Sequence, residues 1–179
     1  VILDKIFARD GFDSGGALAF FNDQLYITVG DAGEHHFATD PNILLGKILR
    51  INRDGSIPFD NPYPNSPIFN IGHGNSHGIG FDHNGFGIIT EHDGKFFDEI
   101  NSIKKGDNYG YPTLQPLDKN PYLFESSNST MPLIIFWKNI EPTEVIYYDG
   151  KKLPEYREKF LFGSNQGHIY ALDIDTIEE

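Results

Sequence analysis

The chain has 179 residues, of which 26 are acidic and 14 are basic, so its formal net charge at pH 7 is -12. This charge would repel a nucleic-acid backbone and an anionic membrane surface, and it argues against either as a partner. The chain contains no cysteine, which excludes disulfides and thiolate metal sites, and it has no run of about 20 apolar residues that would predict a membrane span.

Strand patterns follow one another along the chain, and helix patterns are nearly absent. Strand-like runs flank short turns of Asn, Asp and Gly at Asn22–Asp23, Asp54–Gly55 and Asn84–Gly85. Such turns between apolar, β-branched runs are typical of hairpins. The best helix candidate, PEYREKF at Pro154–Phe160, is long enough only for a turn or a single short helix. The sequence therefore predicts an all-β protein.

Three segments repeat the order strand, turn, strand and polar loop, beginning at Gly15, His77 and Thr143. With its continuation, each segment makes roughly four strands, which is the content of one β-propeller blade. We therefore expect residues 1–179 to form a single, partial propeller domain of about three to four blades. An open arc exposes apolar blade faces, so we expect either a homodimer or further blades to close the ring.

Several motifs are similar, in order and nearly in spacing, to those of the glucose/sorbosone dehydrogenase family. They lie between about Asp13 and Asp173 and include SGGALAF, LYITVGDAG, LLGKILRINRDGSIPFDNP, IGHGNSHGIGF and DEINSIKKGDNYGYP. The family includes soluble quinoprotein sugar dehydrogenases, which are six-bladed β-propellers that use pyrroloquinoline quinone (PQQ) and calcium. The resemblance implies a propeller of the six-bladed type, only part of which is present in this chain.

The resemblance places Asp13 at the position of the family's catalytic base. The segment reads FDSGGAL, where family members have a pattern like H-x-G-G-R-L whose histidine takes the hydroxyl proton from C1 of the sugar. A carboxylate can act as a general base, but its unperturbed pKa of about 3.9 makes it weaker than imidazole at neutral pH. Asp13 is therefore a candidate catalytic residue, and a turn residue that caps the start of a strand is the alternative.

The segment FNIGHGNSHGIGF corresponds to the family's G-H-R-N-P-Q-G, which contacts the quinone. Gly74 stands at the arginine position, Asn75 is retained, and His77 stands at the glutamine position. Because arginine binds carboxylates in a bidentate way, its loss is expected to lower the affinity for PQQ. The cofactor-binding residues that we expect are Asn75, His77, His92, Asp98 and Asn139.

The histidines of this segment allow a second interpretation. His73 aligns with a family histidine and is expected to be a structural hydrogen-bonding residue. A transition-metal site at His73 and His77 is the alternative, although residues four apart converge on a helix and only sometimes on a strand or turn.

The calcium-binding part of the resemblance lies in EHDGKFFDEIN and the NYGYP that follows. It implies one Ca²⁺ at the carboxylate of Glu99 and the backbone carbonyl of Tyr109, since Ca²⁺ prefers oxygen ligands. A second calcium, beside the quinone, would use the backbone carbonyls of Asp93 and Gly94. For Asp98 and Glu99, solvated acids beside a strand are the alternative interpretation.

The function implied by the resemblance is PQQ- and calcium-dependent oxidation of an aldose sugar at C1, impaired by the replacements at Asp13 and Gly74. One alternative is a non-catalytic, calcium-stabilised propeller that binds carbohydrate or protein, and another is a fragment of a longer sugar dehydrogenase. Active members are exported, which implies an extracellular or periplasmic location, although the charged first residues do not form a signal peptide.

Overall fold

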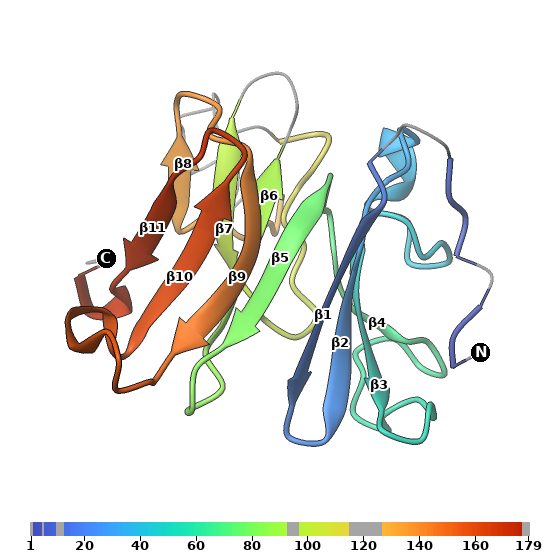
Figure 1. Ribbon diagram of the computed structural model, residues 1–179. Helices are drawn as coiled ribbons and strands as arrows, with labels where there is room; N and C mark the ends of the chain where they lie inside the picture. The colour runs from blue at the N-terminus through green and yellow to red at the C-terminus, as the bar shows by residue number, and fades with distance from the viewer. Residues whose placement is uncertain (1, 5, 10–12, 93–96, 115–126, 177–179) are drawn as a thin grey trace.

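The computed structural model describes residues 2–4, 6–9, 13–92, 97–114 and 127–176. They form three antiparallel sheets and three short 3-10 helices, His35–Phe37, Pro154–Tyr156 and Ile174–Thr176 (Figure 1). The all-β class is confirmed, and the helix candidate at Pro154 is a single 3-10 turn. No helix among the described residues is long and apolar enough to cross a membrane.

Each sheet is a meander in which strands that follow one another in sequence are hydrogen-bonded neighbours. The first contains β1 (Gly15–Phe21), β2 (Gln24–Val29), β3 (Lys47–Asn52) and β4 (Ile68–Ile71). The second contains β5 (Ser76–Phe81), β6 (Gly87–His92), β7 (Asp98–Ser102) and β8 (Ile134–Phe136). The third contains β9 (Pro142–Tyr148), β10 (Lys159–Ser164) and β11 (Ile169–Leu172), so it has three strands where the repeat predicted roughly four. These sheets are the three repeated units, and each has the form of a propeller blade.

The hairpin turns follow from backbone conformations that only a few residue types adopt easily. Asn22 and Asp23, between β1 and β2, have φ angles of 49° and 59°. Two successive positive φ angles are the signature of the type I′ turn, which matches the twist of the flanking strands. The sequence-based prediction of this hairpin is therefore confirmed.

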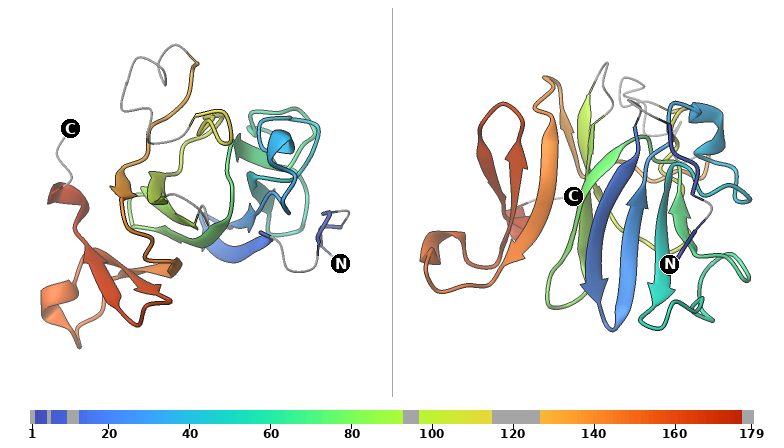
Figure 2. Two further views of the ribbon diagram at one scale, coloured as in Figure 1. Left: turned by 90° about the horizontal axis from the view of Figure 1, so that it is seen from above. Right: turned by 45° about the vertical axis from the view of Figure 1, so that its right-hand side comes forward.

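The strands β1, β5 and β9 lie side by side and begin at the same end of the molecule (Figures 1 and 2). Glycine allows β5 and β9 to approach closely, because a Cβ atom on Gly78 would lie 2.6 Å from the carbonyl oxygen of Thr143. Since the three strands start together, the residues at their first positions face one another. We call this end of the molecule the mouth.

Apolar side chains fill the spaces between neighbouring blades. Ala17, Ile48 and Phe69 of the first blade pack against Ile79 and Ile89 of the second. A second cluster between the second and third blades contains Ile88, Ile100, Val145, Phe160 and Phe162. Burial of each large apolar side chain is worth roughly 1.5–3 kcal/mol, so these two interfaces hold the blades in their relative positions.

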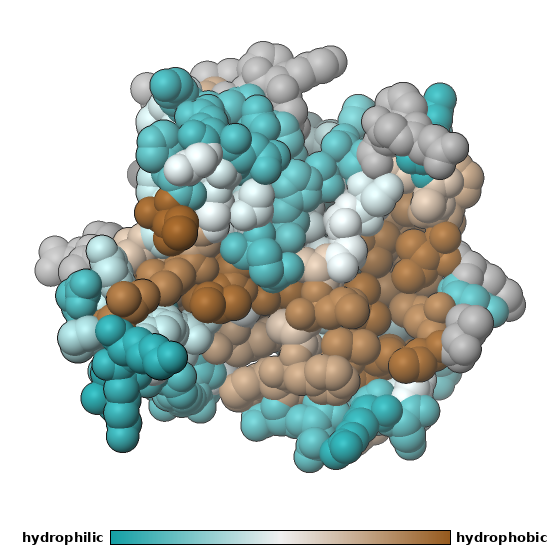
Figure 3. Space-filling model, in the orientation of Figure 1, coloured by the Kyte–Doolittle hydropathy of each residue, from teal (hydrophilic) through white to brown (hydrophobic). Residues whose placement is uncertain are grey.

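Other apolar side chains are not covered. Leu18 and Phe20 on β1 are 59% and 65% exposed, and Ile146 on β9 and Ile169 on β11 are 55% and 83% exposed. Figure 3 shows an apolar band across this face, with polar residues toward the mouth. An exposed apolar surface of this extent is unusual for an isolated domain and agrees with the expectation that an open arc of blades leaves apolar surface uncovered.

Candidate functional site

A network of hydrogen bonds centred on Asn75 joins the starts of β1 and β5 at the mouth. Nδ2 of Asn75 donates to Oδ1 of Asp13 at 2.9 Å and lies 2.8 Å from Nε2 of His77. Its Oδ1 accepts a hydrogen bond from the backbone N–H of Gly15 at 3.3 Å. The amide of this nearly buried side chain therefore has partners for both its donor and its acceptor ends.

His77 extends the network to the third blade. Its Nδ1 lies 3.1 Å from the carbonyl oxygen of Pro142, the first residue of β9. A carbonyl can only accept, so Nδ1 carries the ring hydrogen and Nε2 accepts from Asn75. The ring is thereby held as the Nδ1–H tautomer. One hydrogen-bonded network links the starts of β1, β5 and β9, the innermost strands of the three blades.

His92 and Asp98 form a second polar pair at the mouth. Nδ1 of His92 lies 2.7 Å from Oδ1 of Asp98. The other oxygen of Asp98 accepts hydrogen bonds from the backbone N–H groups of Ile140 at 2.5 Å and Glu141 at 2.7 Å. The His92 ring lies 5.9 Å from the ring of His77, measured between centroids. The fully buried carboxylate of Asp98 thus fixes the orientation of His92 beside the first network.

This pairing shifts the pKa values of both partners in directions that favour their charged forms. The hydrogen bond to Asp98 raises the pKa of His92, against the effect of burial, and the negative charges of Glu141 and Asp13 add to the increase. Burial alone would raise the pKa of Asp98, but the hydrogen bonds from His92 and from the two backbone N–H groups lower it below its usual value. The two side chains therefore form an ion pair at pH values between the lowered pKa of Asp98 and the raised pKa of His92.

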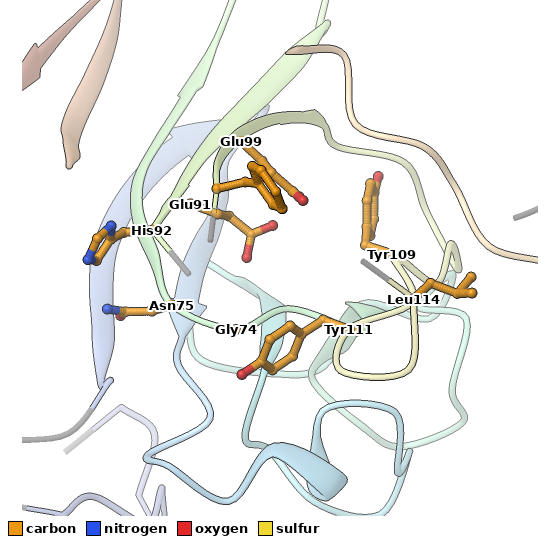
Figure 4. A pocket seen from close by; sticks show the side chains of 10 residues that line it. Gly74, Asn75, Glu91, His92, Glu99, Tyr109, Tyr111 and Leu114 are labelled. Carbon is orange, nitrogen blue, oxygen red and sulfur yellow. The ribbon is translucent and has the colours of Figure 1, made fainter. Parts of the chain in front are cut away.

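A cavity of about 30 Å³ lies next to these residues (Figure 4). This volume is enough for a water molecule or an ion. Ten residues line it: Gly72, Gly74, Asn75, Glu91, His92, Phe97, Glu99, Tyr109, Tyr111 and Leu114. The cavity therefore brings together residues from β6 and β7 and from the segments before β5 and after β7.

Two carboxylates face the cavity from directly opposite positions on β6 and β7. Glu91 pairs with Glu99 in the register of these strands, and Nδ2 of Asn101 donates to both, at 2.7 Å and 3.1 Å. Within the described part of the chain, the buried Oδ1 of Asn101 has no hydrogen-bond partner. Like charges directly opposite on neighbouring strands repel each other, so this arrangement would be stabilised by a cation.

Glu91 is also part of a buried polar group beneath the cavity. The two ring nitrogens of His73 lie 2.9 Å from Oε2 of Glu91 and 2.9 Å from Oδ1 of Asn70. Burial alone would raise the pKa of Glu91, but the charge of His73 and the hydrogen bonds from His73, Ser76 and Asn101 lower it. His73 is therefore the buried, structural hydrogen-bonding residue that the sequence predicts.

Gly74 lies against the ring of Tyr111. A Cβ atom at position 74 would be 3.3 Å from Cζ of Tyr111, and the hydroxyl group of Tyr111 lies 2.8 Å from Nδ1 of His35. The same nitrogen lies 2.5 Å from the buried carboxylate of Asp31. Gly74 stands where family members have an arginine. The phenol ring of Tyr111 lies beside it, and His35, which pairs with Asp31, fixes the hydroxyl group of that ring.

The structure brings most of the predicted site residues together. Five of them, Asp13, Asn75, His77, His92 and Asp98, lie at the mouth, and Glu99 and Tyr109 line the same cavity. For Asn139 the structure gives a backbone contact, a hydrogen bond from Nε2 of Gln166 to its carbonyl oxygen. The predicted calcium ligands Asp93 and Gly94 lie outside the described residues.

The transition-metal alternative gains no support from the described ranges. His73 points toward Glu91 and Asn70, whereas His77 points toward Asn75 and Pro142. No group of three or more His, Cys, Asp or Glu side chains among these residues is arranged to hold a metal ion. A calcium site built from one carboxylate and backbone carbonyls does not require such a group.

Sequence reasoning did not assign roles to Glu91, Asn101 or Tyr111. Glu91 and Asn101 belong to the motifs EHDG and DEIN, which are the signal that could have indicated them. Most of the contacts that give them a role join parts of the chain far apart in sequence, such as Tyr111 and His35, and do not follow from a single motif.

Comparison with known proteins gives consistent matches. A family model described as "Glucose / Sorbosone dehydrogenase" matches residues 1–179. Quinoprotein glucose dehydrogenase B of Acinetobacter calcoaceticus is 38% identical over 122 residues, which are 55% of this chain and 26% of that protein.

Solved structures match the fold over nearly the whole chain. A glucose dehydrogenase superposes with a TM-score of 0.83 and 25% identity, covering 94% of this chain and 52% of that one. The PQQ-bound form of an aldose sugar dehydrogenase from Streptomyces coelicolor superposes with a TM-score of 0.71 and 26% identity, covering 89% and 48%. The chain thus spans about half the length of these structures, and its three blades match part of a larger propeller.

We predict that Asp98→Asn destabilises the protein by about 2–4 kcal/mol, because it removes a buried charge that accepts three hydrogen bonds. The contribution of His92 is present below its usual pKa of 6.5 and is lost as the pH rises through the raised value. The contribution of Asp98 is present above 3.8 and is lost as the pH falls through the lowered value. Chemical denaturation of the wild type and of Asp98→Asn between pH 4 and 8 measures the difference in their free energies of unfolding.

The control is Asp149→Asn, because Asp149 pairs with His83 on the surface, where both side chains are more than 60% exposed. It is expected to change stability by at most about 0.5 kcal/mol. Equal effects of the two substitutions would contradict the role given to Asp98.

Proposed function

Because the chain belongs to the glucose/sorbosone dehydrogenase family, we propose that it forms part of the mouth of a sugar dehydrogenase that oxidises an aldose at C1. The observation that carries this proposal is the convergence of Asp13, Asn75 and His77 in one hydrogen-bonded network at the starts of the innermost strands. The names of the relatives, a quinoprotein glucose dehydrogenase and a PQQ-bound aldose sugar dehydrogenase, support the substrate class.

Oxidation of an aldose at C1 removes a proton from the hydroxyl group and a hydride from the carbon atom. Asp13 is the proposed proton acceptor, since its carboxylate is held toward the mouth by Nδ2 of Asn75. His77 is less suited to this role, because Nε2 already accepts from Asn75 and Nδ1 already donates to Pro142. The hydride needs a separate acceptor, and this is the chemistry that a bound quinone supplies in quinoproteins.

The described residues do not by themselves form a good site for PQQ, which carries three carboxylates. No Lys or Arg is among the described side chains that line the cavity, and Glu91 and Glu99 face it. Asn75, His77 and Asn139 offer neutral polar contacts, and Gly74 offers no side chain. We propose that this part of the mouth binds PQQ weakly and that the activity is impaired unless residues outside this chain supply the cations.

The residues fit calcium better. Glu99 and Tyr109 line one cavity, the carboxylate of Glu91 faces Glu99 across the strands, and a buried amide oxygen of Asn101 has no partner among the described residues. Oxygen-rich, anionic surroundings are the preference of Ca²⁺. We propose one Ca²⁺ at the carboxylate of Glu99 and the backbone carbonyl of Tyr109. The proposed second site at Asp93 and Gly94 lies outside the described residues.

The second candidate function is a non-catalytic, calcium-stabilised propeller that binds carbohydrate or protein. The replacement of the arginine by Gly74 favours it, because it removes the strongest anion-binding group of the family motif. In both cases the exposed side chains Leu18, Phe20, Ile146 and Ile169 need a cover, which we propose is a second copy or further blades. By family resemblance, we expect the protein to act outside the cytoplasm.

We predict that the purified chain, supplied with PQQ and Ca²⁺, reduces an artificial dye in the presence of aldoses. Asp13→Asn should lower the rate by about 100-fold or more, which is the usual contribution of a general base. Asp23→Asn is the matched control, because Asp23 lies in an exposed turn, and its rate should equal that of the wild type. Absence of turnover, together with absence of a quinone absorbance shift on mixing, would argue against the dehydrogenase.

The same mixture tests whether the missing cation limits quinone binding. Gly74→Arg should increase the affinity for PQQ about tenfold or more, because it adds a charged, bidentate donor. A Cβ atom at this position would lie 3.3 Å from Cζ of Tyr111, so the ring must shift by a few tenths of an ångström to admit the new side chain. Asn84→Arg, in the exposed turn between β5 and β6, adds the same charge at the other end of the blade. Equal gains from both variants would mean that only net charge matters.

We predict that Ca²⁺ raises the melting temperature and that EDTA reverses the increase. At a free Ca²⁺ concentration of 100 times Kd, the expected stabilisation is about 2.7 kcal/mol. Glu99→Gln should abolish it, whereas Glu155→Gln, on an exposed 3-10 turn, should preserve it. A melting temperature that does not respond to EDTA would count against this calcium site.

A further inference from the structure

Lys47, the first residue of β3, is a buried cation that the proposed function does not use. Its side chain is completely inaccessible to solvent. Nζ donates hydrogen bonds to the backbone carbonyl oxygens of Phe37 at 2.8 Å, Ala38 at 2.7 Å and Leu45 at 2.6 Å. An ammonium group has three donors, and here each one has a carbonyl partner, as a metal ion would have in a cage of carbonyls.

Lys47 takes part in none of the ion pairs among the described residues. The carboxylate that acts on it electrostatically is that of Asp40, which is partly exposed. Burial lowers the pKa of Lys47 to about 7, and Asp40 opposes this only in part. Burying an ammonium in this way costs free energy, which the three carbonyl contacts offset.

The carbonyls of this cage belong to the segment 30–46 between β2 and β3. The carbonyl oxygen of Ala38 accepts from Nζ of Lys47 and also from the backbone N–H of Gly72, at 2.8 Å. The N–H of His73 donates to the carbonyl of Gly46 at 3.2 Å. The segment therefore lies directly on the backbone at Gly72 and His73, immediately before the mouth residues Gly74 and Asn75.

From Gly72 the same contacts reach the wall of the cavity. Gly72 lines the cavity, and its carbonyl oxygen accepts from the N–H of Tyr111 at 3.3 Å. Segment 30–46 also carries His35, whose Nδ1 lies 2.8 Å from the hydroxyl group of Tyr111. Segment 30–46 thus contacts the hydroxyl group of Tyr111 directly, and it contacts the backbone of Tyr111 through Gly72.

We propose that Lys47 is a positioning residue whose ammonium group, held by three backbone carbonyls, fixes the Gly72 and Tyr111 wall of the cavity in which the cation binds. The identity of that cation as Ca²⁺ rests on the proposed function, whereas the fixing of the wall does not. Lys47 acts through segment 30–46 and touches neither substrate nor cation.

Amide hydrogen exchange tests the proposal in the chain itself. In Lys47→Met, which keeps the aliphatic stem, the amides of Gly72 and Tyr111 should exchange at least tenfold faster than in the wild type. Lys47→Arg should give an intermediate rate, because a planar guanidinium cannot point toward all three carbonyls. Lys159→Met, at a partly exposed ion pair with Asp173 on the third blade, should stay within twofold of the wild type.

Exchange in Lys47→Met within twofold of the wild type at both amides would overturn the proposal. If Lys47→Met does not fold, Lys47→Arg decides: exchange within twofold of the wild type at both amides in that variant would then overturn the proposal.

Luminescence of Tb³⁺, a Ca²⁺ substitute that Tyr109 and Tyr111 can sensitise, connects the wall to binding. Lys47→Met should weaken Tb³⁺ binding at least fivefold, and Lys159→Met less than twofold. Unchanged Tb³⁺ affinity in Lys47→Met would overturn the link between Lys47 and the cavity. Absence of Tb³⁺ binding to the wild type would instead overturn the proposed calcium site, and the exchange rates would still decide the role of Lys47.

Discussion

The mouth depends on the side chain of Asn75, which joins the starts of the innermost strands. Apolar packing between blades is close but non-directional. Hydrogen bonds require distances near 3 Å and defined directions, so they fix the relative positions of the strand starts more precisely. Asn75 contacts Asp13 and Gly15 at the start of β1 and His77 within β5, and His77 continues to Pro142 at the start of β9. Because every polar end of this amide has a partner, the candidate base and the neighbouring imidazole have one relative geometry.

The sequence was sufficient to predict the features that follow from local pattern. Alternating apolar runs and the Asn22–Asp23 turn gave the hairpins and hence the blades, whereas the family resemblance gave Asp13 and Asn75 as site residues. The ion pair of Asp98 could not be predicted in the same way, because it needs the N–H of Glu141, 43 residues further along the chain. The carbonyl cage of Lys47 was also beyond prediction, since backbone carbonyls carry no sequence signature.

The negative charge of the mouth favours one of the two proposed ligands, Ca²⁺, over the other, PQQ. Glu91 and Glu99 line the cavity, whereas the ammonium of Lys47 is bound by the backbone carbonyls of segment 30–46 and does not line it. Such a surface attracts a divalent cation and a neutral polyol more readily than a tricarboxylate. The chain spans about half the length of its solved relatives, which agrees with the proposal that it holds the calcium-binding side of the mouth and not the cationic groups for the quinone.

The tautomer of His77 is the most direct test of the network that defines the mouth. Long-range ¹H–¹⁵N correlation spectra at neutral pH distinguish a protonated Nδ1 from a protonated Nε2 in each histidine. We predict the Nδ1–H tautomer for His77 in the wild type and a weaker preference for it in Asn75→Leu, where only the carbonyl of Pro142 still selects it. A His77 ring protonated at Nε2 in the wild type would contradict the account, because Asn75 could not then join the three blades as described.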